Sequence, residues 1–402
     1  MGVIENLKGR RILIWGYGRE GQSTRQFLKR CCEPASVEVF EGKREEIDED
    51  KYDLIIKSPG IRMDEDSPKY TSQTELFLEE YRDQVIGVTG TKGKSTTSSM
   101  LNHVLTRVRS GKTILLGNIG EPCLNFFDEI TDDTIVVFEM SCHQLAHVHV
   151  SPHIAVFLNL HEEHLDYYGT MDRYFEAKKH IATYQKEGDI LLVGEGVPDI
   201  ETAAEVIHMP YDTTGDYDLQ ILGKHNICNA NFVLRIVSDI LGYDRDKAIE
   251  TLHDFTGLPH RLSYIGERDG IRYYDDSIST IPDATIQALE SVPDAYTVLI
   301  GGMDRGIGYE VLIDYMRKHP EYRYICSYDS GRRIYSEVED LEYVYYTETL
   351  EEAVRLARDM TPAGKACILS PASASYGYFK NFEQRGEMFR DYVFEDNGPA
   401  DR

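Results

Sequence analysis

Short apolar runs that end in a glycine-rich turn and lead into a helical pattern recur along the chain, and this alternation constrains the fold more than any other feature. The clearest example is QVIGVTGTKGKS, which begins at Gln84 and is followed by a helical pattern over residues 96–107. Apolar strands that alternate with helices form mainly parallel sheets covered by helices. We therefore predict an α/β fold.

The alternation falls into three units, which predict three domains over residues 1–83, 84–259 and 260–402. The first unit has the apolar runs RILIW, SVEVF and YDLIIKSPG, and the second has QVIGVTG, KTILLG, TIVVFEMS, IAVFLNL and DILLVG. The third has IRYYDDS, YTVLIGG, YRYICSY and KACILSPAS, with helical patterns such as PDATIQALESV and TLEEAVRLARDM between them. We expect Rossmann-like first and third domains and a central domain of the P-loop type.

Charge and cysteine usage restrict the classes of partner. The 402 residues carry a formal net charge of −26, which repels nucleic acid and anionic membrane surfaces. The seven cysteines are scattered and form no Cys-x-x-Cys pair, so neither a disulfide framework nor a structural zinc site is expected. No apolar run approaches the roughly 18 residues of a membrane helix. We expect a cytoplasmic protein without nucleic-acid or membrane partners.

The stretch RILIWGYGREG has the glycine spacing of a dinucleotide-binding turn. Gly16, Gly18 and Gly21 permit a tight turn, close approach of a pyrophosphate, and packing of the next helix on the strand. The second strand ends near Glu41, about where a ribose-binding acid would lie. This motif is compatible with a nicotinamide-dependent oxidoreductase, although the same turn binds many anionic ligands.

A second glycine-rich turn, GTKGKS, predicts a phosphate site at residues 90–95. Backbone N–H groups of such a turn form an anion-binding nest. The Lys94 amine would reach the β- and γ-phosphates of ATP, and the Ser95 hydroxyl would suit Mg²⁺. The loop departs from the standard P-loop because Val88 occupies the position of its first glycine. The alternative is a flexible turn that merely contains lysine, and the order of strand, turn, Gly-Lys-Ser and helix argues against it.

Acids, histidines and lysines offer candidates for metal binding. Glu139 ends the apolar run TIVVFE, where a carboxylate beside a phosphate loop suits Mg²⁺; the alternative is an acid at a helix N-terminus. His161 and His164 in HEEH are three residues apart and not four, which disfavours a zinc protease. The histidines of HQLAHVHVSPH fit no zinc spacing, and we interpret most of that segment as strand and loop surface. Adjacent exposed lysines, such as Lys178 and Lys179, usually form a solvated face.

Nine ordered motifs between residues 87 and 390 resemble the Mur ligase family, and within it the glutamate-adding enzymes. They are VTGTKGKST, GNIGEP, EMSCHQL, HEEHLD, EAKKHI, LGKHNICNA, GLPHR, LIGGMDR and LSPASASYGYFKNFEQRGEMF. The resemblance implies an ATP-dependent amide ligase of cytoplasmic peptidoglycan precursor synthesis. Its reaction would add glutamate, with D-glutamate favoured, to UDP-N-acetylmuramoyl-L-alanine through an acyl phosphate. It also implies a monomer of three domains. The first domain, which has weaker matches, would bind the UDP substrate, the central domain ATP, and the last domain glutamate and nucleotide.

The resemblance also implies roles for individual residues. The implied catalytic residues are Lys94, Glu139, His164 and Lys178. The implied ligands of two Mg²⁺ ions are Ser95, Glu139, His164 and Lys178, the last as a carbamate formed with CO₂. The implied ATP-binding residues are Gly90, Thr91, Lys92, Gly93, Lys94, Ser95, Thr96, Asn226, Asn229, Arg261 and Asp276. The implied UDP-substrate residues are Gly16, Tyr17, Gly18, Arg19, Glu41, Ser58, Asn118, Ser141 and Gln144. The implied glutamate-binding residues are Thr280, Arg305, Ser375 and Phe382.

One position departs from the D-glutamate ligases. Their Asp-Ser-Lys-Ala-Thr motif corresponds to DSIST here, so Ile278 replaces a lysine that binds a carboxylate of the amino acid. Three explanations compete: Arg305 supplies the lost charge, glutamate binds in another pose as in the similar L-glutamate-adding ligases, or the enzyme uses another amino acid. The sequence leaves this choice open.

Other classes compete with the glutamate ligase. A nicotinamide-dependent oxidoreductase is supported only by the first glycine motif. A nucleotide-binding regulatory protein without catalysis is disfavoured by the presence of Lys94, Glu139, His164 and Lys178. Folylpolyglutamate synthase shares the fold and the phosphate loop, but it generally lacks the separate first domain predicted for this chain.

Overall fold

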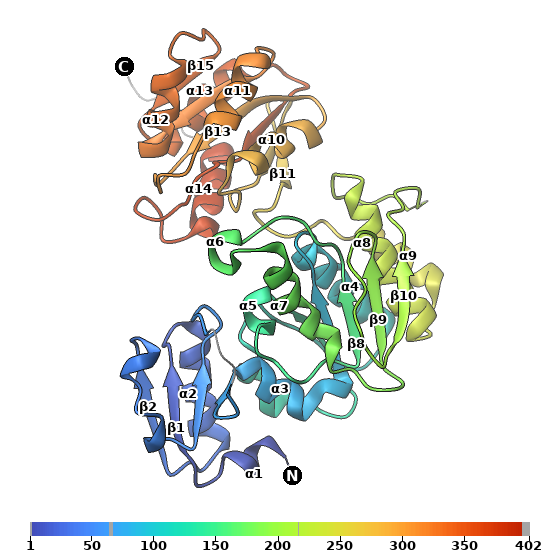
Figure 1. Cartoon of the computed structure of the whole chain (residues 1–402). Helices are drawn as coiled ribbons and strands as arrows, with labels where there is room; N and C mark the ends of the chain where they lie inside the picture. Colours follow the sequence, from blue (N-terminus) through green and yellow to red (C-terminus); the bar gives the residue numbers. More distant parts are fainter. Residues whose placement is uncertain (1, 64–66, 216, 396–402) are drawn as a thin grey trace. The chain divides into compact units, whose positions relative to one another are not determined.

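The computed structural model describes residues 2–63, 67–215 and 217–395, which contain three sheets flanked by helices (Figure 1). The predicted α/β class is confirmed. The chain forms two compact units. One holds the residues up to Asp218 together with Lys224–Phe255, and the other holds Leu219–Gly223 and the residues from Thr256 on. The bounds of the three predicted domains stay predictions, since the first two sheets share one unit.

The first sheet has the strand order β2-β1-β3-β4 with all strands parallel. β1 is buried from its second residue to its end, and the first glycine turn leads from it into α2. The elements of this part are α1 (Val3–Leu7), β1 (Arg11–Trp15), α2 (Arg19–Cys31), β2 (Ser36–Phe40), η1 (Arg44–Glu46), η2 (Glu49–Lys51), β3 (Leu54–Lys57), β4 (Tyr70–Thr71), α3 (Gln73–Tyr81) and η3 (Arg82–Gln84).

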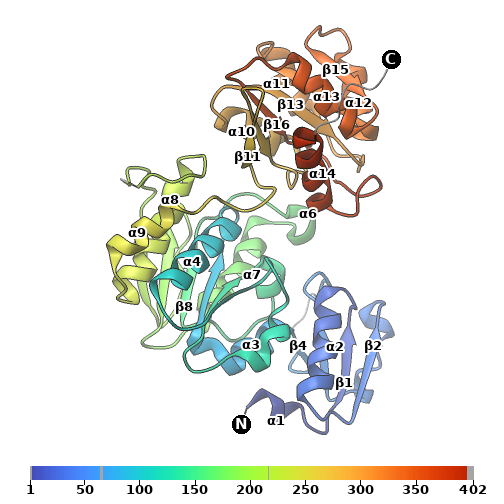
Figure 2. The same cartoon turned by 180° about the vertical axis from the view of Figure 1, so that it is seen from behind.

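The second sheet has the order β10-β9-β8-β5-β7-β6 and shares a hydrophobic cluster with the first, in which the rings of Phe27 and Phe127 lie 4.6 Å apart. β5 and β8 are buried along their whole length, as expected for parallel strands covered on both faces. Helices α4, α8 and α9 pack together on one face, and α7 covers the opposite face (Figure 2). The elements of this part are β5 (Val85–Thr89), α4 (Lys94–Val108), β6 (Thr113–Gly117), η4 (Cys123–Glu129), β7 (Ile135–Glu139), α5 (Cys142–Leu145), β8 (Ile154–Phe157), α6 (Leu165–Tyr168), α7 (Met171–Thr183), β9 (Ile190–Gly194), β10 (Glu205–Met209), α8 (His225–Leu234), η5 (Arg235–Ile240) and α9 (Arg245–His253).

The third sheet, in the order β11-β12-β16-β13-β14-β15, lies in the second compact unit and has a hydrophobic cluster on each face. Because β12, β16 and β13 are parallel, the loops that follow them meet at one edge. The elements of this part are β11 (Ser263–Arg268), β12 (Ile271–Asp275), α10 (Pro282–Ser291), β13 (Ala295–Gly301), α11 (Glu310–Lys318), β14 (Arg323–Ser327), α12 (Tyr328–Val338), β15 (Val344–Thr347), α13 (Leu350–Met360), β16 (Ala366–Leu369) and α14 (Phe382–Phe394).

Four short strands escaped the sequence analysis. β4 has two residues, and β10 and β15 are edge strands whose side chains are largely exposed or half-exposed. β11 pairs antiparallel with β12 in an irregular register. These strands lack the apolar run that marks a buried strand, which is why the pattern did not reveal them. The helical pattern predicted over 96–107 corresponds to α4.

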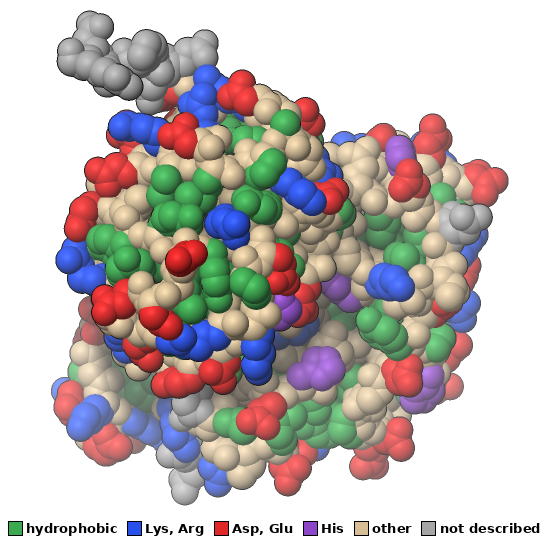
Figure 3. Space-filling model, turned by 90° about the horizontal axis from the view of Figure 1, so that it is seen from above, with side chains coloured by type: hydrophobic (Ala, Val, Ile, Leu, Met, Phe, Trp, Pro, Cys, Tyr) green, Lys and Arg blue, Asp and Glu red, His purple; other side chains and the backbone are tan. Residues whose placement is uncertain are grey.

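One face of the molecule is mixed in charge. On the face of the molecule shown in Figure 3, acidic and basic side chains are interspersed. Such mixing is usual for a solvated protein surface. Within the part of the chain that the structure describes, every helix is too short or too polar to cross a membrane.

Candidate active site

The second glycine-rich turn joins β5 to α4. Gly90 has a φ of 154° and Gly93 a φ of 81°, backbone conformations that residues with a side chain rarely adopt. A Cβ on Gly93 would lie 2.8 Å from Oδ1 of Asn229, so glycine lets the turn approach α8. The first N–H groups of α4, which have no partner within the helix, therefore lie beside a glycine-rich turn. That arrangement suits a phosphate group.

Hydrogen bonds from the segment after β8 hold this turn. The Lys92 N–H donates to Oδ1 of Asn159 at 2.8 Å. The His161 N–H donates to the Thr91 hydroxyl at 2.9 Å. Asn159 was not predicted from the sequence, and its place two residues beyond a buried parallel strand was the signal that could have revealed it.

Lys94 is the first residue of α4, and its side chain folds back on the turn. Its amine donates to the carbonyls of Gly90 and Thr91, at 3.0 and 2.9 Å. Burial lowers the pKa of Lys94. Ser95 and Thr96 follow it, both half-buried. The first turn of α4 thus carries an amine and two hydroxyl groups beside the glycine turn.

Glu139 is the last residue of β7 and is fully buried. Its Oε1 accepts a hydrogen bond from the Asn118 amide at 2.7 Å, whereas its Oε2 is buried without a hydrogen-bond partner. α5 begins only at Cys142, so the carboxylate belongs to a strand end and not to a helix N-terminus. A buried carboxylate oxygen without a partner is costly and calls for a cation.

The two adjacent lysines of α7 enter opposite environments. The Lys178 side chain is 1% exposed, and its amine donates to the Gly90 carbonyl at 2.7 Å and lies 4.9 Å from the centre of the Tyr174 ring. Lys179 is partly exposed and pairs with a neighbouring glutamate at 2.7 Å. Burial, followed by the charge of Lys94, lowers the pKa of Lys178 to about 7. Near neutral pH its amine is therefore a nucleophile, as an ordinary lysine is not.

Glu139 and Lys178 form a buried corner at the C-terminal edge of the second sheet. Glu139 follows β7, the phosphate turn follows the neighbouring strand β5, and the Lys178 amine reaches that turn from α7. Mg²⁺ prefers oxygen ligands. The unpartnered oxygen of Glu139 fits such an ion, and so does Lys178 once its amine carries a carboxylate.

His164 approaches this corner through Tyr174, whose ring centre lies 6.1 Å from that of His164 and 4.9 Å from the Lys178 amine. It has a φ of 57° as the N-cap residue of α6, and its side chain is 45% exposed. Among the described residues it shares no hydrogen bond or ion pair with Glu139, and its ring lies 5.3 Å from that of His143. The segment HQLAHVHVSPH, most of which was interpreted as strand and loop surface, begins in helix α5, where His143 lies. This residue and Cys142 lie on α5 with their ligand atoms close to that of His164, a proximity that spacing within one segment does not reveal.

The first glycine turn is closed by direct contacts. Gly16 has a φ of 90°, and a Cβ there would lie 2.8 Å from the side chain of Ile61. The Ser58 hydroxyl donates to the Gly16 carbonyl at 3.0 Å. The Arg19 side chain donates to the Gly120 carbonyl at 2.6 Å. Of the other predicted residues here, Tyr17 is half-buried, and Gly18, Arg19 and Glu41 are exposed.

A polar seam joins the first sheet to α5. Ser141 and Gln144 cap α5 through reciprocal hydrogen bonds, and the Gln144 amide donates to Oε1 of Glu20 at 2.9 Å. Burial raises the pKa of Glu20. Burial also lowers the pKa of Lys57 to about 8. Glu20 and Lys57 were not predicted from the sequence. The available signals were that Glu20 is a charged residue directly beside a glycine turn and that Lys57 is one at the end of an apolar strand.

Four of the predicted ATP-binding residues are divided between the two compact units. Asn226 and Asn229 are buried on α8, where the amide of Asn229 donates to Oδ1 of Asn226 at 3.0 Å. Arg261 and Asp276 lie in the other unit. Arg261 is exposed, whereas Asp276 is buried and accepts a hydrogen bond from the Leu262 N–H at 3.0 Å. Burial raises the pKa of Asp276 to about 6.

The predicted glutamate-binding residues gather at the C-terminal edge of the third sheet. The Arg305 side chain donates to the Thr280 carbonyl at 3.3 Å. The Met303 N–H donates to the Ala374 carbonyl at 2.8 Å, which brings the loop that contains Arg305 beside the one that contains Ser375. Ser375 is buried and Arg305 is exposed.

Phe382 joins the same edge through the backbone. Its carbonyl accepts a hydrogen bond from the Ser277 hydroxyl at 2.8 Å, and Ile278 follows in that loop, half-buried. Arg385 was not predicted from the sequence; it is 1% exposed and donates to the carbonyls of Ser277 and Ser373 at 2.7 and 3.1 Å. Its Nη1 is buried without a hydrogen-bond partner. The available signal was an arginine that stands among apolar residues in the last motif, LSPASASYGYFKNFEQRGEMF.

A cavity of about 560 Å³ lies at the edge of the first sheet opposite to the first glycine turn. Its lining includes Arg10, Tyr70, Glu75, Glu79 and His149, and none of the predicted site residues. Its two glutamates do not suit a pyrophosphate.

Both the sequence and the fold are similar to those of known proteins. The family model of the Mur ligase middle domain matches residues 88–206. A UDP-N-acetylmuramoyl-L-alanine–L-glutamate ligase of Salinispora tropica is 32% identical over 98% of this chain and 100% of its own length. A UDP-N-acetylmuramoylalanine–D-glutamate ligase of Aquifex aeolicus is 30% identical over 95% of this chain and 98% of its own. The crystal structure of a MurF ligase of Thermotoga maritima in complex with ADP has the same fold, with a TM-score of 0.61 at 17% identity over 97% of this chain and 96% of that chain.

Proposed function

Because the chain belongs to the Mur ligase family, we propose that it is an ATP-dependent ligase that joins glutamate to UDP-N-acetylmuramoyl-L-alanine in peptidoglycan precursor synthesis. The observation that carries the proposal is the buried corner of Glu139 and Lys178 beside the phosphate turn. The relatives that are named glutamate ligases support the substrate pair. The first glycine turn is then assigned to the pyrophosphate of UDP and not to a nicotinamide cofactor.

We assign Ser95, Glu139, His164 and a carbamate on Lys178 to two Mg²⁺ ions. When bound, these ions offset the negative charge of the phosphates. The carbamate forms when the neutral Lys178 amine attacks the carbon of CO₂, so that a C–N bond forms and one proton is released. A pKa of about 7 leaves a large neutral fraction of Lys178 at neutral pH. The modification also replaces a buried cation beside Lys94 by an anion, which removes a like-charge repulsion.

The proposed reaction has two steps, and the chain acts in both by positioning and by charge. The carboxylate of the UDP substrate attacks the γ-phosphorus of ATP, ADP leaves, and an acyl phosphate forms. The neutral amine of glutamate then attacks the acyl carbon, inorganic phosphate leaves, and the nitrogen loses a proton as the amide forms. The N–H groups at the start of α4 and the Lys94 amine bind the phosphates, the amine exchanging two backbone carbonyls for phosphate oxygens. No side chain needs to become covalently attached to substrate.

The loops after β12, β13 and β16 are proposed to bind glutamate through Thr280, Arg305, Ser375 and Phe382. Glutamate brings two carboxylates, and Arg305 supplies a cation at this edge, whereas Ile278 supplies none. D-glutamate is the first candidate. L-glutamate is the second, and it is favoured by Ile278 and by the similarity to L-glutamate ligases of Salinispora tropica and a Micromonospora strain.

Phosphate release with ATP, UDP-N-acetylmuramoyl-L-alanine and each glutamate enantiomer tests this function. We expect release that requires both the UDP substrate and one enantiomer, and a product whose mass has increased by one glutamyl residue. Release that ignores the UDP substrate, or an absence of the amide product, would contradict the proposal. An absorbance change of a nicotinamide with these substrates would favour the oxidoreductase.

The remaining assignments are proposals of the same kind. We propose domains at 1–83, 84–259 and 260–402, the last boundary being supported by the start of a compact unit at Thr256. We also propose that the enzyme acts in the cytoplasm as a monomer, without nucleic-acid or membrane partners. Light scattering of the full chain during size exclusion measures the oligomeric state directly, and a dimer mass would contradict the monomer.

A further inference from the structure

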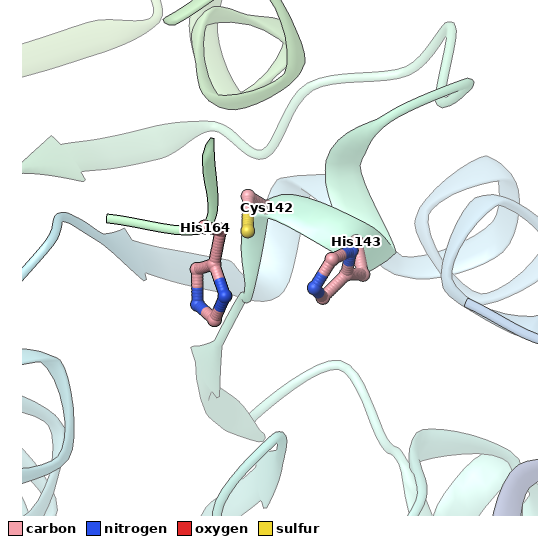
Figure 4. Close-up of side chains that lie close together, drawn as sticks. All are labelled: Cys142, His143 and His164. Atoms are coloured by element: carbon pink, nitrogen blue, oxygen red, sulfur yellow. The ribbon is translucent and has the colours of Figure 1, made fainter. Parts of the chain in front are cut away.

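A sulfur atom and two imidazole rings converge beside the proposed magnesium ligands. The ligand atoms of Cys142, His143 and His164 all lie within 4.8 Å of one another. Figure 4 shows the Cys142 side chain between the two histidine rings. Two of the residues come from the first turn of α5, and the third ends the loop that leads into α6. Within the described ranges, no other set of three His, Cys, Asp or Glu side chains is close enough to share an ion.

Local structure fixes these positions. Ser141 caps α5, so that Cys142 and His143 stand at its first helical positions. His164 presents its ring to that of His143 at 5.3 Å. Cys142 is 2% exposed, whereas the side chain of His164 is 45% exposed. The cluster is thus anchored in the interior and open to solvent at one end, which gives an ion a path of entry.

We propose that Cys142, His143 and His164 form a binding site for a borderline-soft divalent metal ion, and specifically for Zn²⁺. Thiolate and imidazole are ligands that zinc prefers, whereas Mg²⁺ prefers oxygen. Three protein ligands leave a fourth tetrahedral position for water. Binding converts the Cys142 thiol to a thiolate and releases its proton to solvent. His164 is also one of the proposed magnesium ligands, whereas Cys142 and His143 are not.

The geometry requires a small closure of the side chains. Tetrahedral zinc, with Zn–S bonds of about 2.3 Å and Zn–N bonds of about 2.0 Å, places its ligand atoms roughly 3.3–3.5 Å apart. The three ligand atoms lie within 4.8 Å of one another, and rotation of the half-exposed histidine side chains brings them to these shorter distances. The Tyr168 hydroxyl lies 3.2 Å from Nδ1 of His143, and its ring stacks on that imidazole. A hydrogen bond of this kind orients a metal-binding histidine.

Zinc at this site would inhibit the ligase, a consequence that rests on the proposed function of His164. A neutral imidazole offers only one nitrogen lone pair, because its other nitrogen carries a proton, so the His164 ring cannot bind Zn²⁺ beside Cys142 and Mg²⁺ beside Glu139 at the same time. Zinc therefore competes with magnesium although most of their ligands differ. Binding of zinc itself does not depend on the ligase reaction, so the two proposals can be tested separately.

Metal binding is measured on the full chain without substrates. Zn²⁺ is titrated against a chromogenic chelator, and Co²⁺ serves as a probe because a cobalt–thiolate bond gives a charge-transfer band. We expect one zinc per chain, loss of the cobalt band in Cys142→Ser, and zinc binding that is more than about tenfold weaker in His143→Gln. Cys31→Ser and His208→Gln change a half-buried cysteine and an exposed histidine outside the cluster, and as matched controls they should retain both signals.

Unchanged zinc affinity in Cys142→Ser and His143→Gln, or bound Co²⁺ without the thiolate band, overturns the proposal. Retention of ATP binding by each variant verifies its fold. A separate arm measures Mg²⁺-dependent phosphate release, which zinc should inhibit in the wild type and at least tenfold less effectively in Cys142→Ser. A chain that binds zinc as described but releases no phosphate contradicts the proposed function and leaves the zinc site supported. An active ligase without the cobalt–thiolate band contradicts the zinc site alone.

Discussion

Replacing Lys178 with methionine isolates the effect of burying its charge. Methionine fills a similar space without a charge, and the Gly90 carbonyl that loses the Lys178 amine keeps the hydrogen bond from Lys94. In the folded chain the pKa of Lys178 is lowered to about 7. A lysine in an unfolded chain has a pKa of about 10.4. Between these values the folded chain binds fewer protons than the unfolded one, so the free energy of unfolding rises with pH.

The magnitude follows from the two pKa values. A group whose folded pKa is lowered contributes its full stability above the unfolded pKa and loses it as the pH falls to the folded pKa, at about 1.4 kcal/mol per pH unit. At pH 7 the buried Lys178 therefore lowers the free energy of unfolding by about 4 kcal/mol relative to strongly alkaline pH. The methionine variant lacks this dependence. Between pH 7 and 9 the stability of the wild type should rise by roughly 2 kcal/mol relative to Lys178→Met.

Urea unfolding followed by circular dichroism at pH 7, 8 and 9 measures this change, in buffer freed of CO₂ so that no carbamate forms. Lys179→Met is the matched control, because its amine is partly exposed and paired with Glu176. Its stability should differ from that of the wild type by less than about 1 kcal/mol, with little dependence on pH. A constant separation between the wild type and Lys178→Met across these pH values would refute the reasoning, since Lys178 would then keep an ordinary pKa.

Three further substitutions test the proposed site. Lys178→Ala should reduce phosphate release on the order of a hundredfold or more, and formate or acetate should restore part of it by taking the place of the carbamate; unchanged turnover would exclude the carbamate. Ile278→Lys should lower the KM for glutamate or change the preferred enantiomer, and if neither parameter moves, the residue lies outside the glutamate site. Gly93→Ala and Gly196→Ala both place alanine at a positive φ, which costs about 1–2 kcal/mol of stability, measured by urea unfolding. Of the two, Gly93→Ala also brings a Cβ to 2.8 Å from Asn229, whereas Gly196 has open space. Gly93→Ala should therefore lose more stability and weaken ATP binding in calorimetry, and equal losses would contradict the steric argument.

Features that contiguous residues encode could be predicted from the sequence. The apolar run, the glycines and the helical pattern around GTKGKS each have a local signal, and the structure places β5, the turn and α4 there. Glu139 could be placed at a strand end for the same reason, because an apolar run stops at it. The edge strands β10 and β15 could not be predicted, since side chains that face solvent do not form an apolar run.

The proposed glutamate-binding residues at the C-terminal edge of the third sheet could be predicted only in part. Motif resemblance named Thr280, Arg305, Ser375 and Phe382 one by one, and parallel topology explains why loops that are distant in sequence share an edge. Arg385 escaped because its function in the fold depends on carbonyls from two of those loops. A hydrogen-bond network that links separate loops has no signal in any one segment.

The sequence by itself determined the order of strands, turns and helices and the kinds of reacting group, because these depend on local backbone preference and side-chain chemistry. The tertiary structure decided which of two adjacent lysines is buried. Lys178 and Lys179 are about 100° apart around α7, so packing against the phosphate turn buries one amine and leaves the other in water. It also brought Cys142 and His143 to His164 from another segment. Burial and proximity arise only when the chain packs. Burial lowers the pKa of Lys178, and proximity determines which side chains can share a metal ion.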